Sequence, residues 1–216
     1  LYLQLGYRPY PLPYHSGALS RQRPALTGSY SITRSDLTPQ PGYWLTIAPI
    51  YEAYNRDRPL TVARDAAYWK GLHVRKLERP IKGHEVHMFV AHSPTEAQDV
   101  GYLIAYLSNE GAELPEGLDQ AIIMSEIGVM PDHAGAIPHL LSAVAGASVG
   151  ERVLVTSFLP RDPQADEALG LLFEPPVKEL DELYMMARPL AGGMGWEEVE
   201  AIMSAPGATF WHLDLF

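Results

Sequence analysis

The chain of 216 residues has no cysteine and no long apolar run, and each absence excludes a class of protein. Without cysteine there can be no disulfide, no thiolate metal site and no cysteine nucleophile. No run approaches the roughly 18 apolar residues of a membrane span, and no charged segment followed by an apolar stretch opens the chain. We therefore expect a cytoplasmic protein.

Basic residues are also scarce, with 16 Lys and Arg against 26 Asp and Glu, which gives a formal net charge of -10. This balance repels phosphate backbones and anionic lipids, so neither nucleic acid nor a membrane surface is an expected partner. His84 and His87 are three residues apart on a probable strand and therefore face opposite sides of it. We expect no metal site.

The spacing of apolar residues predicts a chain in which strands and helices alternate. In the segments predicted as helices, apolar residues recur every three or four positions among charged ones. The segments predicted as strands are short and apolar. The predicted elements are a strand at 29–34, helices at 43–54 and 60–74, a hairpin at 85–91 and 100–107, a strand at 121–129, a helix at 135–147, a strand at 152–159, a helix at 162–172, a strand at 183–190 and a small helix at 196–204.

A loop with one glycine joins the predicted central strand to the next helix, in residues 127–141 (IGVMPDHAGAIPHLL). A turn of this kind can bind a pyrophosphate, because backbone N–H groups and the helix dipole attract anions at the helix start. The segment resembles the acyl-CoA-binding signature of the GNAT (GCN5-related) N-acetyltransferases, a Val-x-Pro strand end, a Gln/Arg-x-x-Gly-x-Gly/Ala loop and a Leu-Leu helix. Of three defining positions only Gly135 is kept, since Asp132 and Ile137 replace the other two.

Further segments extend the resemblance to an α/β GNAT acyltransferase fold, a twisted mixed sheet with helices on both faces. The opening LYLQLGYRPY is similar to the closing motif of a GNAT domain, and residues 50–69 are similar to the start of the second repeat in tandem acetyltransferases of the enhanced-intracellular-survival type. This implies the C-terminal part of a tandem protein, although the opening could also be an unrelated amphipathic N-terminus. The expected divisions are 1–14 as the end of a preceding repeat, 15–27 as a connector, 28–190 as a GNAT-like domain and 191–216 as a C-terminal helix and tail.

The resemblance implies acetyl-CoA as the cofactor and assigns positions to it. Backbone N–H groups on the central strand would hold the thioester carbonyl, and the loop would hold the phosphates. The glycine at position 128 is compatible with close approach of the ligand or with a β-bulge. It could also simply leave room for a neighbouring side chain. The cofactor positions are Ile127, Gly128, Val129, His133, Ala134, Gly135, Ala136 and Ile137.

Three residues are candidates for the catalytic groups. Glu126 on the central strand could act as the base that takes the proton of the amine, or could be a solvated or salt-bridged glutamate. The tyrosine that serves as the family's acid corresponds to Ala168, so Tyr184 is the substitute candidate, with packing as its alternative. The terminal carboxylate of Phe216 could reach a neighbouring repeat as a base, or the tail could simply dock.

Two functions therefore remain open. One is an N-acetyltransferase that transfers the acetyl group of acetyl-CoA to a small-molecule or peptide amine. The other is a non-catalytic GNAT-like module that packs against the N-terminal repeat of the same protein and helps to enclose its substrate. Tyr2 and Gly6 are retained in the opening fragment where the main domain has Ala168 and Leu172, which favours the second for this chain.

Overall fold

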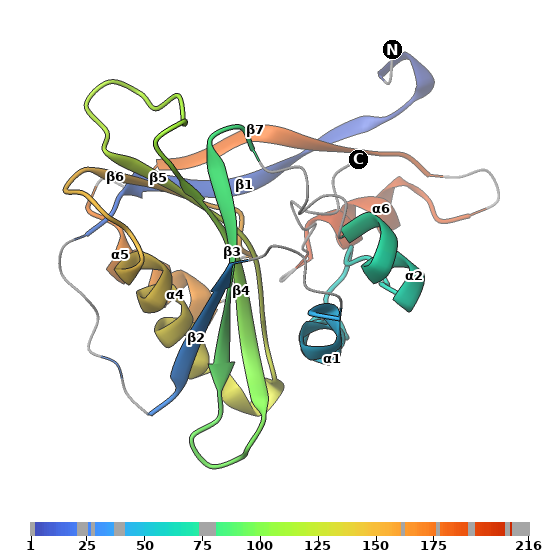
Figure 1. Ribbon diagram of the computed structural model, residues 1–216. Coiled ribbons are helices and arrows are strands. Elements are labelled where there is room, and N and C mark those ends of the chain that lie inside the picture. Colours follow the sequence, from blue (N-terminus) through green and yellow to red (C-terminus); the bar gives the residue numbers. More distant parts are fainter. Residues whose placement is uncertain are drawn as a thin grey trace.

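The protein is built around a seven-stranded mixed sheet, as a computed structural model shows (Figure 1). The strand order is β2-β3-β4-β5-β6-β1-β7, with β5 and β6 parallel and the other neighbours antiparallel. The strands are β1 (Arg8–Ala18), β2 (Ser31–Asp36), β3 (His84–His92), β4 (Asp99–Ser108), β5 (Gln120–Val129), β6 (Val153–Ser157) and β7 (Lys178–Ala187). The structure describes residues 3–20, 26, 29–36, 42–73, 81–160, 163–175, 178–189, 193–205 and 208.

Helices cover both faces of this sheet. The helical elements are α1 (Trp44–Asn55), α2 (Ala66–Tyr68) with a π-helical turn at Trp69–His73, α4 (Ala136–Gly146), α5 (Pro163–Leu172), α6 (Trp196–Met203) and short 3-10 turns at Leu3–Leu5 and Pro131–His133. Helices α4 and α5 lie on one face, and α1 and α2 lie on the other (Figure 1). The expected twisted mixed sheet with helices on both faces is confirmed.

Burial explains why the central elements form where the sequence predicts them. Strand β4 is buried from Val100 to Ser108, because helices pack on both faces of the sheet at its centre and a strand in that position must be apolar throughout. Helix α4 buries Ile137, Leu140, Leu141 and Val144, the face that the helical spacing predicts. The long predicted elements are therefore placed correctly.

The helix predicted over residues 60–74 is wrong for its first half. Leu60 adopts a left-handed backbone conformation, with φ of 71°, which no helix residue can have. The chain stays irregular until Asp65, whose side chain accepts a 2.7 Å hydrogen bond from the Tyr68 N–H and so starts α2. Helical structure is thus confined to 66–73, and residues 74–80 lie outside the described ranges.

Strand β1 inserts between β6 and β7 instead of lying apart from the sheet (Figure 1). Tyr10 is paired with Met185 of β7, and Gly17 is paired with Val155 of β6. The strand runs from the predicted end of a preceding repeat into the predicted connector, so residues 15–18 are strand and not exposed linker. Backbone groups along both neighbouring strands gain partners from it, which is the physical reason for the insertion.

Two glycine-to-alanine substitutions test the local backbone, because one should lower the free energy of unfolding and the other should raise it. Gly83 has φ of 75°, and an added Cβ would lie 2.3 Å from the Ala112 Cα, so Gly83→Ala should lower the free energy of unfolding by about 2 kcal/mol or more. Gly170 lies inside α5 with nothing within 4 Å, so Gly170→Ala should raise it by about 0.5–1 kcal/mol. Parallel urea unfolding measures both; equal stability of the two variants would contradict the described turn.

Candidate functional site

Strand β5 separates from β6 halfway along its length. It pairs with β4 as far as Val129, but its last pair with β6 is Met124 with Ser157. The Met130 N–H donates to the Val100 carbonyl on the β4 side at 2.8 Å. Because successive N–H groups of a strand alternate in direction, those of Ile127 and Val129 point toward the side where β6 has diverged. The central strand is therefore splayed from β6 at this end, with these two N–H groups directed into the opening.

The irregularity of β5 lies at Ser125 and not at Gly128. Ile104 is opposite Glu126 and Ala105 is opposite Met124, which leaves Ser125 as the extra, bulged residue. Gly128 is in regular register with Tyr102, and a Cβ at this position would lie 2.6 Å from the Tyr102 Cε1 atom. The missing side chain at Gly128 therefore makes room for the Tyr102 ring.

Glu126 is completely buried and hydrogen-bonded on both carboxylate oxygens. Arg64 donates to its Oε1 at 2.9 Å and to its Oε2 at 2.8 Å, and both side chains have 0 % exposure. The Tyr102 hydroxyl donates to Oε1 at 2.6 Å. The guanidinium carbon of Arg64 also lies 3.9 Å from the ring centre of Tyr51 and 4.9 Å from that of Trp69. This is a bidentate ion pair enclosed by aromatic rings.

The hydroxyl of Tyr102 is a permanent donor to this pair. Burial raises the pKa of Tyr102 well above its usual value, and the negative charge of Glu126 raises it further. Tyr102 therefore stays protonated at neutral pH. A general base must reach the proton that it removes, whereas Glu126 is sealed from solvent and engaged by two partners. The sequence left two roles open for Glu126, a general base or a solvated or salt-bridged glutamate. In this structure it is salt-bridged.

The predicted phosphate loop leads into α4, and two positions in the first turn of this helix offer no free N–H donor. Pro138 in the first turn has no N–H, and the Ile137 N–H already donates to the Ala134 carbonyl at 3.1 Å. Ile137 does not project into the loop, because its side chain is 1 % exposed within the core. Gly135 precedes the first helical residue, Ala136, and no side chain caps the helix.

Acidic side chains surround the same helix start. Asp132 is exposed in the loop, and a Glu96 carboxylate oxygen from the β3–β4 turn lies 3.8 Å from the His133 Nε2 atom. The hydroxyl of Tyr30 lies 3.3 Å from the His133 Nδ1 atom, and its ring is near Gly135. These two acidic residues near the loop disfavour an anion, whereas the helix dipole would attract one. The residues present do not fit a pyrophosphate.

The remaining predicted catalytic positions contribute no acid in the described part of the chain. Ala168 and Leu172 are buried in the core on α5. Tyr184 is in β7 opposite Pro11, while its side chain lies outside the described residues, as does Phe216. Acid and base roles for Tyr184 and Phe216 stay predictions.

Sequence reasoning missed Arg64, Tyr102, Glu96 and Pro138. The effect of Pro138 could have been predicted from the sequence, since a proline in the first turn of a helix removes a backbone N–H donor. Arg64 could have been suspected only by asking which cation neutralises a glutamate on a central strand, because charged side chains are almost never fully buried without a partner. Nothing in the sequence spacing connects Glu96 to His133.

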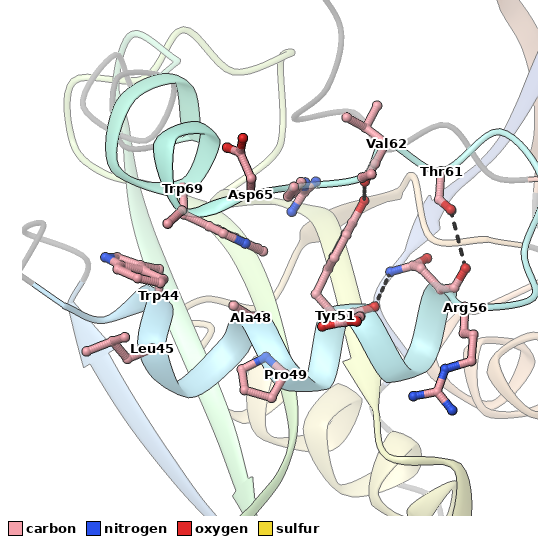
Figure 2. Close-up of a pocket in the computed structure, with 15 residues that line it drawn as sticks. Trp44, Leu45, Ala48, Pro49, Tyr51, Arg56, Thr61, Val62, Asp65 and Trp69 are labelled. Carbon is pink, nitrogen blue, oxygen red and sulfur yellow. Dashed lines mark hydrogen bonds between the residues drawn. The ribbon is translucent and has the colours of Figure 1, made fainter.

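A cavity of about 790 Å³ lies between α1 and the segment that follows it (Figure 2). Figure 2 shows Tyr51 extending from α1 to the Val62 carbonyl, with Trp44 and Trp69 toward one end. The lining residues are Trp44, Leu45, Ala48, Pro49, Tyr51, Glu52, Asn55, Arg56, Thr61, Val62, Ala63, Arg64, Asp65, Ala66 and Trp69.

Within the described ranges, no helix is both long and apolar enough to cross a membrane. In the same ranges, no three His, Asp or Glu side chains lie close enough together to hold a metal ion.

No protein-family model matches the sequence, and no curated protein matches it. Among solved structures, the chain is similar to a GCN5-related N-acetyltransferase from Anabaena variabilis ATCC 29413, with a TM-score of 0.54 and 13% identity over 86% of this chain and 41% of that one. Lower scores are found for a tandem GNAT protein from the clavulanic acid biosynthesis pathway (TM-score 0.46, 16% identity, 87% and 57% covered) and a GCN5-related N-acetyltransferase from Sphaerobacter thermophilus (0.36, 18%, 71% and 44%).

The chain therefore has the GNAT acyltransferase fold. It spans less than two thirds of the length of each of these three structures.

Proposed function

We propose that this chain is a GNAT-fold module of an N-acetyltransferase that helps to enclose the substrate and does not itself bind acetyl-CoA productively. The start of α4 carries this proposal. Pro138 supplies no N–H, the Ile137 N–H is bonded to the Ala134 carbonyl, and two acidic residues lie at the loop, Asp132 within it and Glu96 beside His133. A helix N-terminus binds anions only through free N–H groups and a favourable field.

The state of the candidate catalytic groups supports the same function. Glu126 is held by Arg64 and Tyr102, and Ala168 takes the position at which the family resemblance expects the acidic tyrosine. Neither can exchange a proton with a bound amine. The chemistry is then supplied by another unit of the protein, which we propose to be a preceding GNAT repeat.

The place of β1 supports a tandem arrangement. The opening segment that resembles the end of a GNAT domain, residues 1–10, leads into β1, which is hydrogen-bonded between β6 and β7 of this sheet. A preceding repeat would then be continuous with this sheet through a shared strand and not through a free linker. Such a connection favours a rigid pair of units.

A second candidate function is acetyl transfer by this unit, with a small-molecule or peptide amine as the acceptor. The divergence of β5 from β6 after Met124 favours it, because the N–H groups of Ile127 and Val129 point into the opening where an acyl thioester could bind.

Isothermal titration of acetyl-CoA into the chain distinguishes the two functions. We expect no heat and no thermal shift at millimolar cofactor, because Pro138 and the bonded Ile137 N–H reduce the donors at the helix start and two acidic residues lie near the loop. Micromolar binding would overturn the module and support the enzyme. The double variant Asp132→Arg with Glu96→Gln removes the charge obstacle alone, and we expect it still not to bind, since Pro138 remains without an N–H.

A further inference from the structure

We propose that Thr33, His92 and Asp99 form a hydrolytic site at the β2 edge of the sheet, in which the Thr33 hydroxyl cleaves small carboxylic esters. The three residues come from three neighbouring strands, β2, β3 and β4 (Figure 1). None of them lines the cavity beside α1. The site is therefore separate from the groups described above, and it does not depend on the proposed function.

Two hydrogen bonds join the three side chains in a row. The Thr33 Oγ1 atom lies 2.8 Å from the His92 Nε2 atom. On the other side of the same ring, the Nδ1 atom lies 2.6 Å from a carboxylate oxygen of Asp99. A carboxylate only accepts hydrogen bonds, so Asp99 keeps the ring proton on Nδ1 and leaves the Nε2 lone pair to the Thr33 hydroxyl. A nucleophile, a base and an orienting carboxylate in this order are the arrangement of a hydrolytic triad.

The β3–β4 hairpin fixes the positions of the base and its carboxylate. His92 is the last residue of β3, and Asp99 is the first residue of β4. The register of the two strands shifts between Ala91 and His92, which leaves Val100 as an extra, bulged residue. Val100 is itself held in place, since it is buried and its carbonyl accepts from the Met130 N–H at 2.8 Å. A bulge of this kind re-aims the neighbouring side chain, here Asp99 toward His92.

The reacting groups are accessible to a substrate. Thr33 is exposed, and the side chains of His92 and Asp99 are 34 % and 35 % exposed. A general base must reach the proton that it removes, and His92 already contacts the hydroxyl that would lose it. Glu126, which is sealed from solvent, is in the opposite situation.

The outer edge of β2 provides a donor for the negative charge that develops on the ester oxygen. The Ser93 N–H donates to the Gln98 carbonyl on the β4 side at 3.0 Å, so strand alternation directs the Val90 N–H toward β2. Thr33 is opposite Val90, and its own N–H therefore points to β3. The next N–H, that of Arg34, then points outward from β2, the outer strand of the described sheet. The residue after the nucleophile is one place from which hydrolases stabilise an oxyanion.

The reaction balances with these groups and water alone. The Thr33 oxygen bonds to the carbonyl carbon while its proton passes to the His92 Nε2 atom. The bond to the leaving alcohol then breaks, and the alcohol oxygen takes this proton. Water attacks the acyl-Thr33 ester by the same route, which releases the carboxylic acid and restores the hydroxyl. Asp99 stays ionised and holds the ring in one orientation.

Hydrolysis of p-nitrophenyl acetate tests the site, because the leaving group is coloured and the probe contains no part of coenzyme A. Thr33→Ala and His92→Ala should each lower the catalysed rate at least about ten-fold. Asp99→Asn should also lower it, since the ring would lose the tautomer that leaves Nε2 free. Thr33→Ser keeps a hydroxyl and should retain the rate. Acid quenching, digestion and mass spectrometry should locate the acetyl group on Thr33.

Two matched variants control for the general reactivity of exposed side chains. Ser31 is an exposed hydroxyl residue on the same face of β2 as Thr33, and His84 is the half-buried first residue of β3, as His92 is its last. Ser31→Ala and His84→Ala should keep the rate and the label. An unchanged rate in Thr33→Ala, an equal loss in the two control variants, or an acetyl label only at other residues would overturn the proposal. A rate lost in Thr33→Ala and kept in Thr33→Ser would show that the hydroxyl, and not folding, is responsible.

Discussion

Replacing Arg64 with alanine should lower the free energy of unfolding by about 3–5 kcal/mol, among the largest effects expected from a single polar residue. The loss arises because Glu126 would keep its buried position without the cation that neutralises its charge. Removing one member of a buried pair exposes the full desolvation penalty of the other. Guanidinium or urea unfolding measures the change directly.

An exposed ion pair provides the matched control. Lys82 and Glu113 are 2.8 Å apart with side chains 84 % and 86 % exposed, so Lys82→Ala should leave stability unchanged within error. Arg64→Lys keeps the charge but loses the two-pronged geometry, and it should fall between the wild type and Arg64→Ala. Arg64→Ala behaving like Lys82→Ala would show that the described pair does not exist in solution.

A paired substitution separates charge from packing. Arg64→Met with Glu126→Leu removes both charges and keeps apolar volume, so it should recover most of the stability lost by Arg64→Ala.

Local periodicity explains which parts of the fold were predictable. The helix at 136–146 and strands β3, β4 and β5 have long apolar patterns, and a pattern that long leaves few alternatives. Residues 60–65 misled the prediction because their apolar spacing is helical. The left-handed Leu60 and the Asp65 cap override that spacing, and neither is visible as a periodicity.

Contacts between distant residues explain what the sequence could not predict. Arg64 and Glu126 are 62 positions apart, and β1 pairs with strands that begin at Val153 and Lys178. No local signal specifies such pairings. Glu126 illustrates this limit: its strand was predicted correctly, but the sequence left open whether it is a base or a salt-bridged glutamate, because the arginine that pairs with it comes from another element.

Ile137 shows that comparison with a family motif can make a core residue look like an obstacle to cofactor binding. Compared with the acyl-CoA signature, Ile137 replaces a glycine and looks like a block to the cofactor. The helical spacing that joins it to Leu140, Leu141 and Val144 places it in the core instead, and it is 1 % exposed. Restoring the glycine would therefore remove a core side chain without opening a phosphate site.

Ile137→Gly should lower the free energy of unfolding by about 3–6 kcal/mol, since the cavity left by the side chain and the glycine in a helix both destabilise. Leu171→Gly is the matched control, because Leu171 is helical but 52 % exposed and measures the glycine penalty of about 1 kcal/mol without the cavity. Acetyl-CoA should give no thermal shift with either variant. If Ile137→Gly were no less stable than Leu171→Gly, Ile137 would not be a core residue. If it gained a thermal shift with acetyl-CoA, the helix start would be able to hold the phosphates, and the main support of the module hypothesis would be lost.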